Sequence, residues 1–148
     1  MATHQVPSWD EYFLQIAGAV SARAKCTRRR VGAVLVVERR IIATGYNGAA
    51  SGEPDCLEGA CPRGQLGYDA VPALGDYDRP GTEGFCIAIH AEVNALLFAT
   101  RDTKGATAYI TDPPCPGCRK ALAAAGIDRV VWPDGVYQGR SEIMDWAR

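Results

Sequence analysis

The segment CIAIHAEVNALLFA, residues 86–99, sets the interpretation of the whole chain. It is an apolar run of the kind that forms a buried helix, yet His90 and Glu92 stand at its beginning. Only one other histidine, His4, occurs in the sequence, and it lies in the N-terminal tail. Because polar side chains are costly to bury, we expect His90 and Glu92 to have partner residues elsewhere in the chain.

Matching residues occur in the stretch PPCPGC, residues 113–118. Its cysteines, Cys115 and Cys118, lie on a turn that enters a helix, so both thiolates can bind one zinc ion and are stabilised by the helix N-terminus. His90 can supply a third ligand. Three protein ligands leave a fourth position open for water, which is the pattern of a catalytic zinc site rather than a structural one.

Glu92 follows His90 too closely in sequence to be a comfortable fourth ligand, but it can reach a metal-bound water. Zinc lowers the pKa of such a water to ~7, which makes hydroxide available at neutral pH. A carboxylate beside it can take the proton and pass it to a ring nitrogen and a leaving amine. The segment therefore predicts a proton shuttle next to a source of hydroxide.

Each of these motifs has an ordinary explanation when it is taken alone. A histidine on an apolar helix face is usually a core residue, and a lone CxxC motif is often redox-active or structural. Their combination in one chain, with helices and strands at the expected places, favours the metal site.

The flanking sequence predicts one sheet covered by helices on both faces. Ser8 and Glu11 have capping-box spacing before an amphipathic helix, and short runs rich in Val and Ile indicate strands. The expected elements are, in order, a helix at 8–26, two strands joined by a tight turn at 31–47, a loop at 47–85, a helix at 90–101, a strand at 106–111, a helix at 114–126, a strand at 129–132 and a helix at 141–148. A loop of this length in a small domain is usually functional or disordered, and its cysteines favour a function.

The composition is that of one globular domain, because 148 residues with 47% hydrophobic content are enough for a core. A net charge of −1 provides no basic field for nucleic acid. No apolar run reaches the ~20 residues of a membrane span, and no secretory signal is recognisable. We therefore expect a cytoplasmic protein, in whose reducing compartment six cysteines indicate metal binding or catalysis more than disulfides.

Five segments resemble, in order and spacing, the deoxycytidylate (dCMP) deaminase family of the cytidine deaminase-like superfamily. They are SWDEYFLQIA (8–17), VGAVLV (31–36), IIATGYNG (41–48), IHAEVNAL (89–96) and PPCPGC (113–118). His-Ala-Glu followed by Pro-Cys-x-x-Cys is the general signature of zinc deaminases. The resemblance covers residues 8–132. It implies a three-layer α/β/α sandwich with a central mixed sheet of four or five strands, and a single domain over 1–148 with a Cys-containing lid insertion at about 47–88.

The resemblance also implies roles for individual residues. The catalytic zinc would be bound by His90, Cys115 and Cys118. Glu92 would be the proton shuttle, and the backbone of Ala91 would contact the pyrimidine ring. Asn47 would hydrogen-bond the sugar and base region, although a turn role in YNG is its alternative. Tyr137 would either close over the nucleotide or pack in the core.

A nucleotide needs cations for its phosphate. Arg28 and Arg30 precede the first strand and could reach a 5′-phosphate with forked hydrogen bonds, and Arg101 is a further candidate. Any one arginine taken singly is more often a solvated surface charge. In related enzymes, residues matching Phe98 and Arg101 lie near subunit contacts, so the resemblance implies a homo-oligomer, either a dimer or a hexamer.

Four further cysteines remain after the catalytic set. They are Cys26, Cys56, Cys61 and Cys86. Related deaminases with this insertion carry cysteines at comparable places and bind a second, structural zinc, which would hold the lid in place. Free thiols and adventitious disulfides are the alternatives, and no CxxC spacing supports the second site.

The leading function is hydrolytic deamination of dCMP to dUMP and ammonia, with hydroxide attack at C4 and proton transfer by Glu92. One alternative is deamination of another amino-heterocycle: a modified cytidylate, a nucleoside, guanine or a tRNA adenosine. The net charge argues against tRNA. A non-catalytic, zinc-stabilised, competence-associated protein is a third possibility, against which the presence of Glu92 argues. The short segment 133–148 makes regulation by dCTP or dTTP doubtful.

Overall fold

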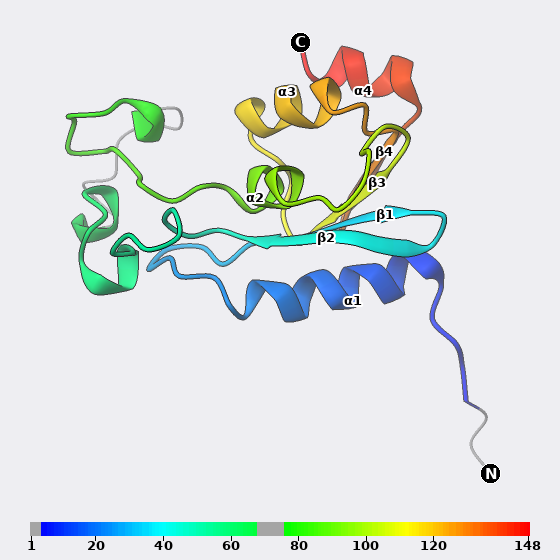
Figure 1. Cartoon of the computed structure of the whole chain (residues 1–148), viewed down its shortest axis with the longest axis horizontal. Coiled ribbons are helices and arrows are strands. Elements are labelled where there is room, and N and C mark those ends of the chain that lie inside the picture. Colours follow the sequence, from blue (N-terminus) through cyan, green and yellow to red (C-terminus); the bar gives the residue numbers. More distant parts are fainter. Residues whose placement is uncertain (1–3, 68–75) are drawn as a thin grey trace.

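A five-stranded mixed sheet forms the centre of the computed structural model, which describes residues 4–67 and 76–148 (Figure 1). The strands are β1 (Gly32–Val37), β2 (Arg40–Tyr46), β3 (Thr107–Ile110), β4 (Arg129–Trp132) and β5 (Gly135–Gln138). Their order across the sheet is β2-β1-β3-β4-β5. Strands β3 and β4 run parallel, and the other neighbouring pairs run antiparallel.

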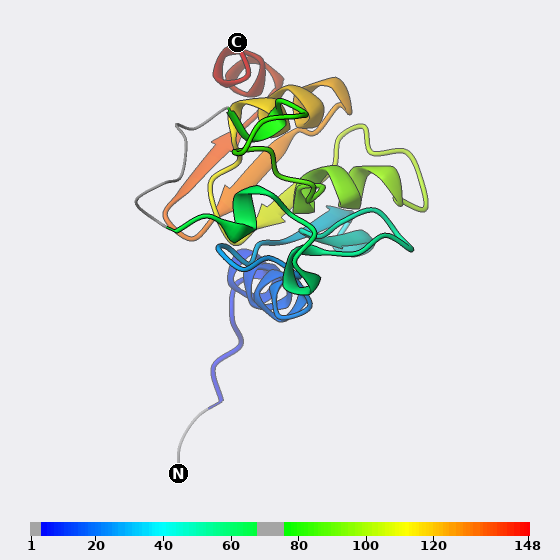
Figure 2. The same cartoon turned by 90° about the vertical axis from the view of Figure 1, so that its left-hand side faces the viewer.

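Helices cover both faces of this sheet. Helix α1 (Trp9–Ser21) lies on one face, whereas α2 (Ala91–Leu97), α3 (Pro116–Ala124) and α4 (Arg140–Trp146) lie on the other (Figures 1 and 2). The predicted three-layer α/β/α sandwich is therefore confirmed, with five strands.

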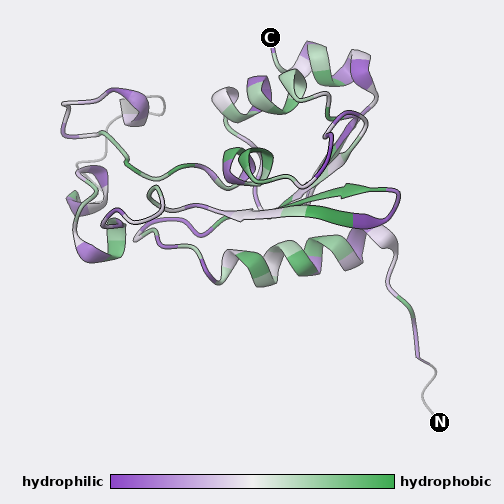
Figure 3. Cartoon of the chain, in the orientation of Figure 1, coloured by the Kyte–Doolittle hydropathy of each residue, from purple (hydrophilic) through white to green (hydrophobic). Residues whose placement is uncertain are grey.

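Two apolar clusters fill the spaces between the layers. On the side of α1, Phe13 and Ala17 pack against Val34 of β1. On the opposite side, Leu35 of β1 and Leu122 of α3 belong to a larger cluster and are completely buried. Strand β1 contributes to both clusters because successive side chains of a strand point to opposite faces. Hydrophobic and hydrophilic bands alternate along α1, as expected for a helix with one buried face (Figure 3).

The local sequence explains where α1 begins and where the β1–β2 hairpin turns. The Ser8 hydroxyl accepts a hydrogen bond of 3.1 Å from the backbone N–H of Glu11, so it caps α1 as predicted. The β1–β2 hairpin turns at Glu38 and Arg39, whose φ angles of 51° and 63° are both positive. Two consecutive positive φ angles match the twist of a tight antiparallel hairpin.

Strand β5 is the one regular element that the sequence does not predict. It has four residues whose exposure alternates between half-buried and exposed, and it pairs with β4 through a tight turn. Such a short edge strand gives a weak period-two signal. No helix in the described part of the chain is long and apolar enough to cross a membrane.

The region between β2 and α2 leaves and re-enters the sandwich at one point. Gly48 and Ile89 form an isolated antiparallel bridge, with N–H···O distances of 3.2 and 2.7 Å. Between them, the described residues include three short 3-10 helices, η1 (Cys56–Glu58), η2 (Arg63–Gln65) and η4 (Asp76–Asp78). We call residues 49–88 the insert. Its ends are thereby held beside the start of α2.

Candidate active site

Three potential metal ligands meet where α2 and α3 begin. The Nδ1 atom of His90 lies 3.2 Å from the sulfur of Cys118 and 3.4 Å from the sulfur of Cys115. All three ligand atoms lie within 4.8 Å of one another. One imidazole and two thiols at this separation fit a tetrahedral zinc ion and leave one position for water.

Helix ends place these ligands. His90 is the N-cap of α2, and Cys115 is the N-cap of α3, with Pro116 at the first helical position. Proline is favoured there because the first helical N–H has no partner within the helix. Cys118 follows one turn later and is buried. The positive end of the α3 dipole therefore faces two sulfur atoms and stabilises their thiolate forms.

The two thiols differ in how readily they lose a proton. Their mutual hydrogen bond lowers the pKa of Cys115 to about 3, with His90 contributing, and raises the pKa of Cys118 well above its usual range. The Cys115 thiolate in turn raises the pKa of His90. A negative sulfur beside an imidazole is the charge distribution that attracts a divalent cation, whose binding releases the remaining proton.

Glu92 lies in the first turn of α2 with only 4% of its surface exposed. Burial raises the pKa of its carboxyl group, against the opposing effect of a hydrogen bond with Cys118. A carboxyl group whose pKa is raised toward neutrality can both accept and return a proton. The structure therefore places a buried carboxyl group with a raised pKa beside the potential metal ligands.

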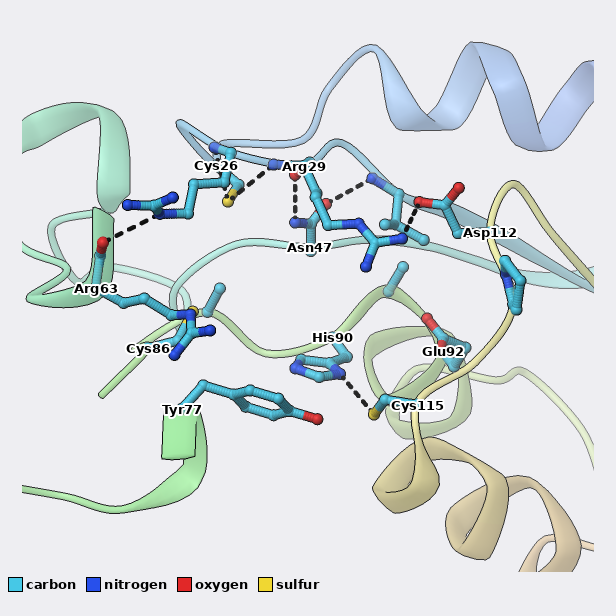
Figure 4. A pocket seen from close by; sticks show the side chains of 15 residues that line it. Cys26, Arg29, Asn47, Arg63, Tyr77, Cys86, His90, Glu92, Asp112 and Cys115 are labelled. Carbon is cyan, nitrogen blue, oxygen red and sulfur yellow. Dashed lines mark hydrogen bonds and ion pairs between the residues drawn. The ribbon is translucent and has the colours of Figure 1, made fainter. Parts of the chain in front are cut away.

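A cavity of about 320 Å³ opens in front of these residues (Figure 4). His90, Glu92 and Cys115 line one end of it, and Asn47 and Arg29 line another part. This volume lies in the range of small-molecule sites. The cavity therefore brings a buried carboxyl group, a set of potential metal ligands and cationic side chains together.

Comparison with known proteins identifies this arrangement. Residues 7–133 match the family model described as the cytidine and deoxycytidylate deaminase zinc-binding region. The chain belongs to this deaminase family. The matched zinc-binding region contains His90, Cys115 and Cys118, which are therefore the potential ligands of a zinc ion.

Individual relatives of this deaminase agree with that assignment. The deoxycytidylate deaminase of Mycobacterium phage D29 is 51% identical over 128 residues, which are 86% of this chain and 95% of the relative. The deoxycytidylate deaminase of Saccharomyces cerevisiae is 41% identical over 134 residues, or 89% of this chain, but this chain covers only 39% of the yeast protein. The crystal structure of the dCMP deaminase from cyanophage S-TIM5 in complex with dCMP and dUMP superposes with a TM-score of 0.63 at 29% identity, covering 87% of this chain and 83% of that one.

Two residues predicted to contact the substrate also line the deaminase cavity. Ala91 is completely buried at the first position of α2, and Asn47 is 8% exposed just after β2. The Asn47 side chain accepts a hydrogen bond of 2.9 Å from Val31 and donates one of 2.8 Å to the carbonyl oxygen of Arg29. Asn47 therefore also fixes the segment that leads into β1.

The arginines of the deaminase take different positions. Arg28, Arg29 and Arg63 line the cavity, whereas Arg30 and Arg101 are exposed and are not among its lining residues. The Arg28 guanidinium donates to the carbonyl oxygens of Arg63, at 3.1 Å, and of Leu66. Arg28 thus ties the insert to the segment before β1.

Tyr137 lies in an aromatic cluster at the other end of the sheet. Its ring stacks on Trp146 at 4.7 Å between centroids and contacts Trp132 at 5.6 Å. It is not among the residues that line the cavity. This position agrees with the packing role that the sequence left open.

Three of the four remaining cysteines, Cys56, Cys61 and Cys86, lie in the insert, and Cys26 lies between α1 and β1. Burial and the neighbouring Cys61 raise the pKa of both Cys56 and Cys86. Backbone N–H groups approach the sulfurs as well: Thr27 donates to Cys56 at 3.4 Å. In the described part of the chain, however, only His90, Cys115 and Cys118 bring three ligand atoms within 4.8 Å of one another.

Four polar or aromatic residues that line the cavity were not predicted from the sequence. They are Arg29, Arg63, Tyr77 and Asp112. Arg29 forms a 3.0 Å ion pair with Asp112, which immediately precedes the PPCPGC motif. Their places in sequence, inside an arginine run and beside a ligand motif, are the only signals that could have found these two. Arg63 and Tyr77 lie in the insert, where no periodicity predicts a position.

Proposed function

We infer that this deaminase converts dCMP and water to dUMP and ammonia. The observation that carries the inference is Glu92, buried beside the zinc ligands in a cavity that also holds three arginines. The similarity to the phage D29 deoxycytidylate deaminase extends over nearly all of that protein and supports the same substrate.

The residues around the cavity divide the chemistry between them. His90, Cys115 and Cys118 would hold a zinc ion, which would supply hydroxide at neutral pH. Glu92 would carry two protons in turn: one from water to N3 of the ring, and then one from the hydroxyl added at C4 to the departing amino group, which leaves as ammonia. Ala91, buried next to Glu92 and lining the cavity, would contact the ring through its backbone. Asn47 orients the sugar and base from the opposite wall.

We propose that the phosphate of the substrate binds at the arginine-lined part of the cavity. The Arg29 side chain is 64% exposed, so it can turn toward an incoming anion. Its partner in the present structure is Asp112. Arg28 and Arg63 border the same space. Guanidinium groups suit phosphate because two parallel N–H groups can bind two of its oxygens. The exposed Arg30 and Arg101 are the weaker candidates.

A substrate panel tests the proposed function. Zinc-loaded protein is incubated with dCMP, with deoxycytidine and with CMP, and ammonia release is measured for each. We expect dCMP to be turned over and deoxycytidine to lose about 100-fold or more in kcat/KM, because two charge-assisted hydrogen bonds of about 1.5 kcal/mol each are absent. Turnover of deoxycytidine at least as efficient as that of dCMP would contradict the phosphate proposal, and no ammonia from either compound would contradict the function.

We further propose that Cys26, Cys56, Cys61 and Cys86 bind a second, structural zinc ion. Burial raises the pKa of Cys86 to about 12 and also raises that of Cys56, so these thiols need a cation before they ionise. N–H groups of residues 27–29 point at two of the sulfurs, at 3.4–3.5 Å. Metal analysis decides: wild type should hold two zinc ions per chain and Cys56→Ser one, whereas one ion in the wild type rejects the site.

The assembly and location are proposals of the same kind. We propose that residues 1–148 act as one domain with an insertion at about 47–88. We propose that the protein is cytoplasmic, where its six free thiols would stay reduced.

We also propose a homo-oligomer, either a dimer or a hexamer. Adjacent Leu97 and Phe98, 64% and 69% exposed at the end of α2, supply an apolar contact. Light scattering of the wild type and of a Phe98→Ser variant tests it.

A further inference from the structure

Tyr77 is a part of the insert that reaches the metal ligands. It lies in η4 and is only 9% exposed. Its carbonyl oxygen accepts a hydrogen bond of 2.8 Å from the backbone N–H of Cys86, so its main chain is attached to the segment that leads into α2. A buried tyrosine normally needs a partner for its hydroxyl.

The side chain of Tyr77 lies beside two of the three potential zinc ligands. Its ring lies against the His90 imidazole, with 5.3 Å between centroids and an angle of 40° between planes. Its hydroxyl end points toward Cys115 (Figure 4). Burial and the nearby Cys115 raise the pKa of the Tyr77 hydroxyl. A metal ligand is therefore the group that this hydroxyl faces.

The Tyr77 ring also faces a cation. The guanidinium carbon of Arg63 lies 5.6 Å from the ring centroid, and Arg63 also donates to the carbonyl oxygen of Gly84 at 3.2 Å. A cation over the ring draws electron density from it and makes the phenol a better donor. The insert therefore holds Tyr77 from its backbone and from its ring.

We propose that Tyr77 is a positioning residue for the zinc centre. Its hydroxyl donates a hydrogen bond to the Cys115 thiolate, and its ring fixes the orientation of the His90 imidazole. A metal-bound thiolate keeps free lone pairs, so a donor can bind it without displacing the ion. Such a hydrogen bond withdraws charge from the sulfur, which then gives less to the metal and leaves it a stronger Lewis acid. The insert would in this way act on the reactivity of the centre and not only on access to it.

The proposal concerns the His90, Cys115 and Cys118 site and does not depend on the identity of the substrate. Tyr77 also lines the cavity, so a purely substrate-binding role is the competing explanation. Tyr77→Phe separates the two, because it keeps the ring and removes only the hydroxyl. Tyr77→Leu removes the ring as well. Tyr12→Phe is the matched control, since Tyr12 is 42% exposed on α1, on the opposite side of the sheet.

The test uses readouts that need no substrate. The proteins are loaded with Co²⁺ in place of zinc, and the sulfur-to-metal charge-transfer band is recorded; in parallel, release of zinc to a coloured chelator is followed. Tyr77→Phe should move the band to longer wavelength, because the thiolate lone pairs lose a stabilising donor. It should also release one zinc about tenfold faster, as expected for loss of a hydrogen-bond partner of a metal ligand. Tyr12→Phe should change neither.

Each result bears directly on the proposal. A band and a release rate equal to those of the wild type, with only KM for dCMP raised, would overturn it in favour of substrate contact. A shifted band in Tyr77→Phe with an unchanged circular dichroism spectrum would support it. If Tyr77→Leu shows the shift and Tyr77→Phe does not, packing of the ring alone is responsible, and the hydrogen-bond proposal fails.

Discussion

The amide nitrogen of Asn47 donates a hydrogen bond of 2.8 Å to the carbonyl oxygen of Arg29, and its amide oxygen accepts one of 2.9 Å from the N–H of Val31. One side chain after β2 thus satisfies two backbone groups of the segment before β1. Because Arg29 borders the cavity, the same side chain that faces the cavity also sets the position of a cation.

Replacing Asn47 should therefore lower both stability and substrate affinity. In Asn47→Ala, two partly buried backbone groups lose their partners, and we expect the free energy of unfolding to fall by about 2 kcal/mol. KM for dCMP should rise together with it, since the Arg29 segment is released. Urea unfolding and steady-state kinetics measure the two effects. An unchanged unfolding midpoint combined with a raised KM would mean that Asn47 acts through the substrate alone.

Glu92→Gln should stop the reaction without removing the metal. The amide cannot carry a proton, so we expect kcat to fall by about 10²–10⁴-fold. Because Glu92 is not one of the three grouped ligands, the zinc content should equal that of the wild type. Ammonia release and metal analysis on the same preparation check this. Full activity in a zinc-loaded Glu92→Gln protein would refute the assigned proton carrier.

Arg29→Gln should weaken dCMP binding with little effect on folding. Its 64% exposed side chain makes a surface ion pair with Asp112, and such pairs contribute about 1 kcal/mol or less to stability. Loss of one charge-assisted contact to phosphate should raise KM about tenfold. Arg30→Gln is the control, because Arg30 is exposed and does not line the cavity. Equal effects of the two substitutions would place the phosphate elsewhere.

The contact between α1 and β4 should make stability depend on pH. Both terminal nitrogens of Arg129 bind the carboxylate of Asp10 at 2.6 Å, and the Tyr109 hydroxyl donates to it at 2.8 Å. The Arg129 hydrogen bond, in opposition to partial burial, lowers the pKa of Asp10 below 3.8. A depressed folded-state pKa contributes stability above 3.8, and this contribution disappears as the pH falls through the folded value.

Asp10→Asn should accordingly destabilise the protein by about 1 kcal/mol at neutral pH, since the pair is bidentate but partly exposed. The difference from the wild type should shrink when unfolding is measured near pH 3. Glu11→Gln removes a charge from the same helix turn without a partner in β4, so it controls for the helix dipole. A difference that stays constant with pH would show that the carboxylate charge is not responsible.

Gly45 of β2 is packed against the backbone of α2. A Cβ atom there would meet the carbonyl oxygen of Ala91 and lie 2.5 Å from the amide nitrogen of Ala95. Gly45→Ala must displace the helix that begins at His90, and we expect a loss of about 3 kcal/mol in stability and weaker zinc retention. Gly18→Ala is the contrast, because nothing lies within 4 Å of its added Cβ on α1. It should raise stability by about 0.5–1 kcal/mol. Thermal melts of both variants measure this difference.

The residues of the metal centre were predictable from their types and from their positions at helix starts. Cys115 and Cys118 lie within one turn of each other, and His90 caps another helix, so one shared metal ion explains both motifs. The sandwich was predictable for a similar reason, since Val- and Ile-rich strands alternate with amphipathic helices.

Arg63 and Tyr77 were not predictable, because the path of the insert decides where they lie. That path depends on contacts between distant residues, such as the hydrogen bond from Arg28 to the carbonyl oxygen of Arg63, and no periodic pattern encodes them. Strand β5 was not predicted for a different reason: it has only four residues at the edge of the sheet, which are too few to show a clear alternation.

The zinc ligands come from two separate segments on the same side of the sheet: His90 precedes α2, whereas Cys115 and Cys118 belong to α3. An ion bound by all three would join ligands as much as 28 residues apart in sequence, and would thus cross-link two helices as well as take part in the reaction. Helix α1, on the other side, has no part in this link. Removal of the ion therefore loosens one layer of the sandwich and spares the other, and metal starvation would end catalysis and open that face in a single event.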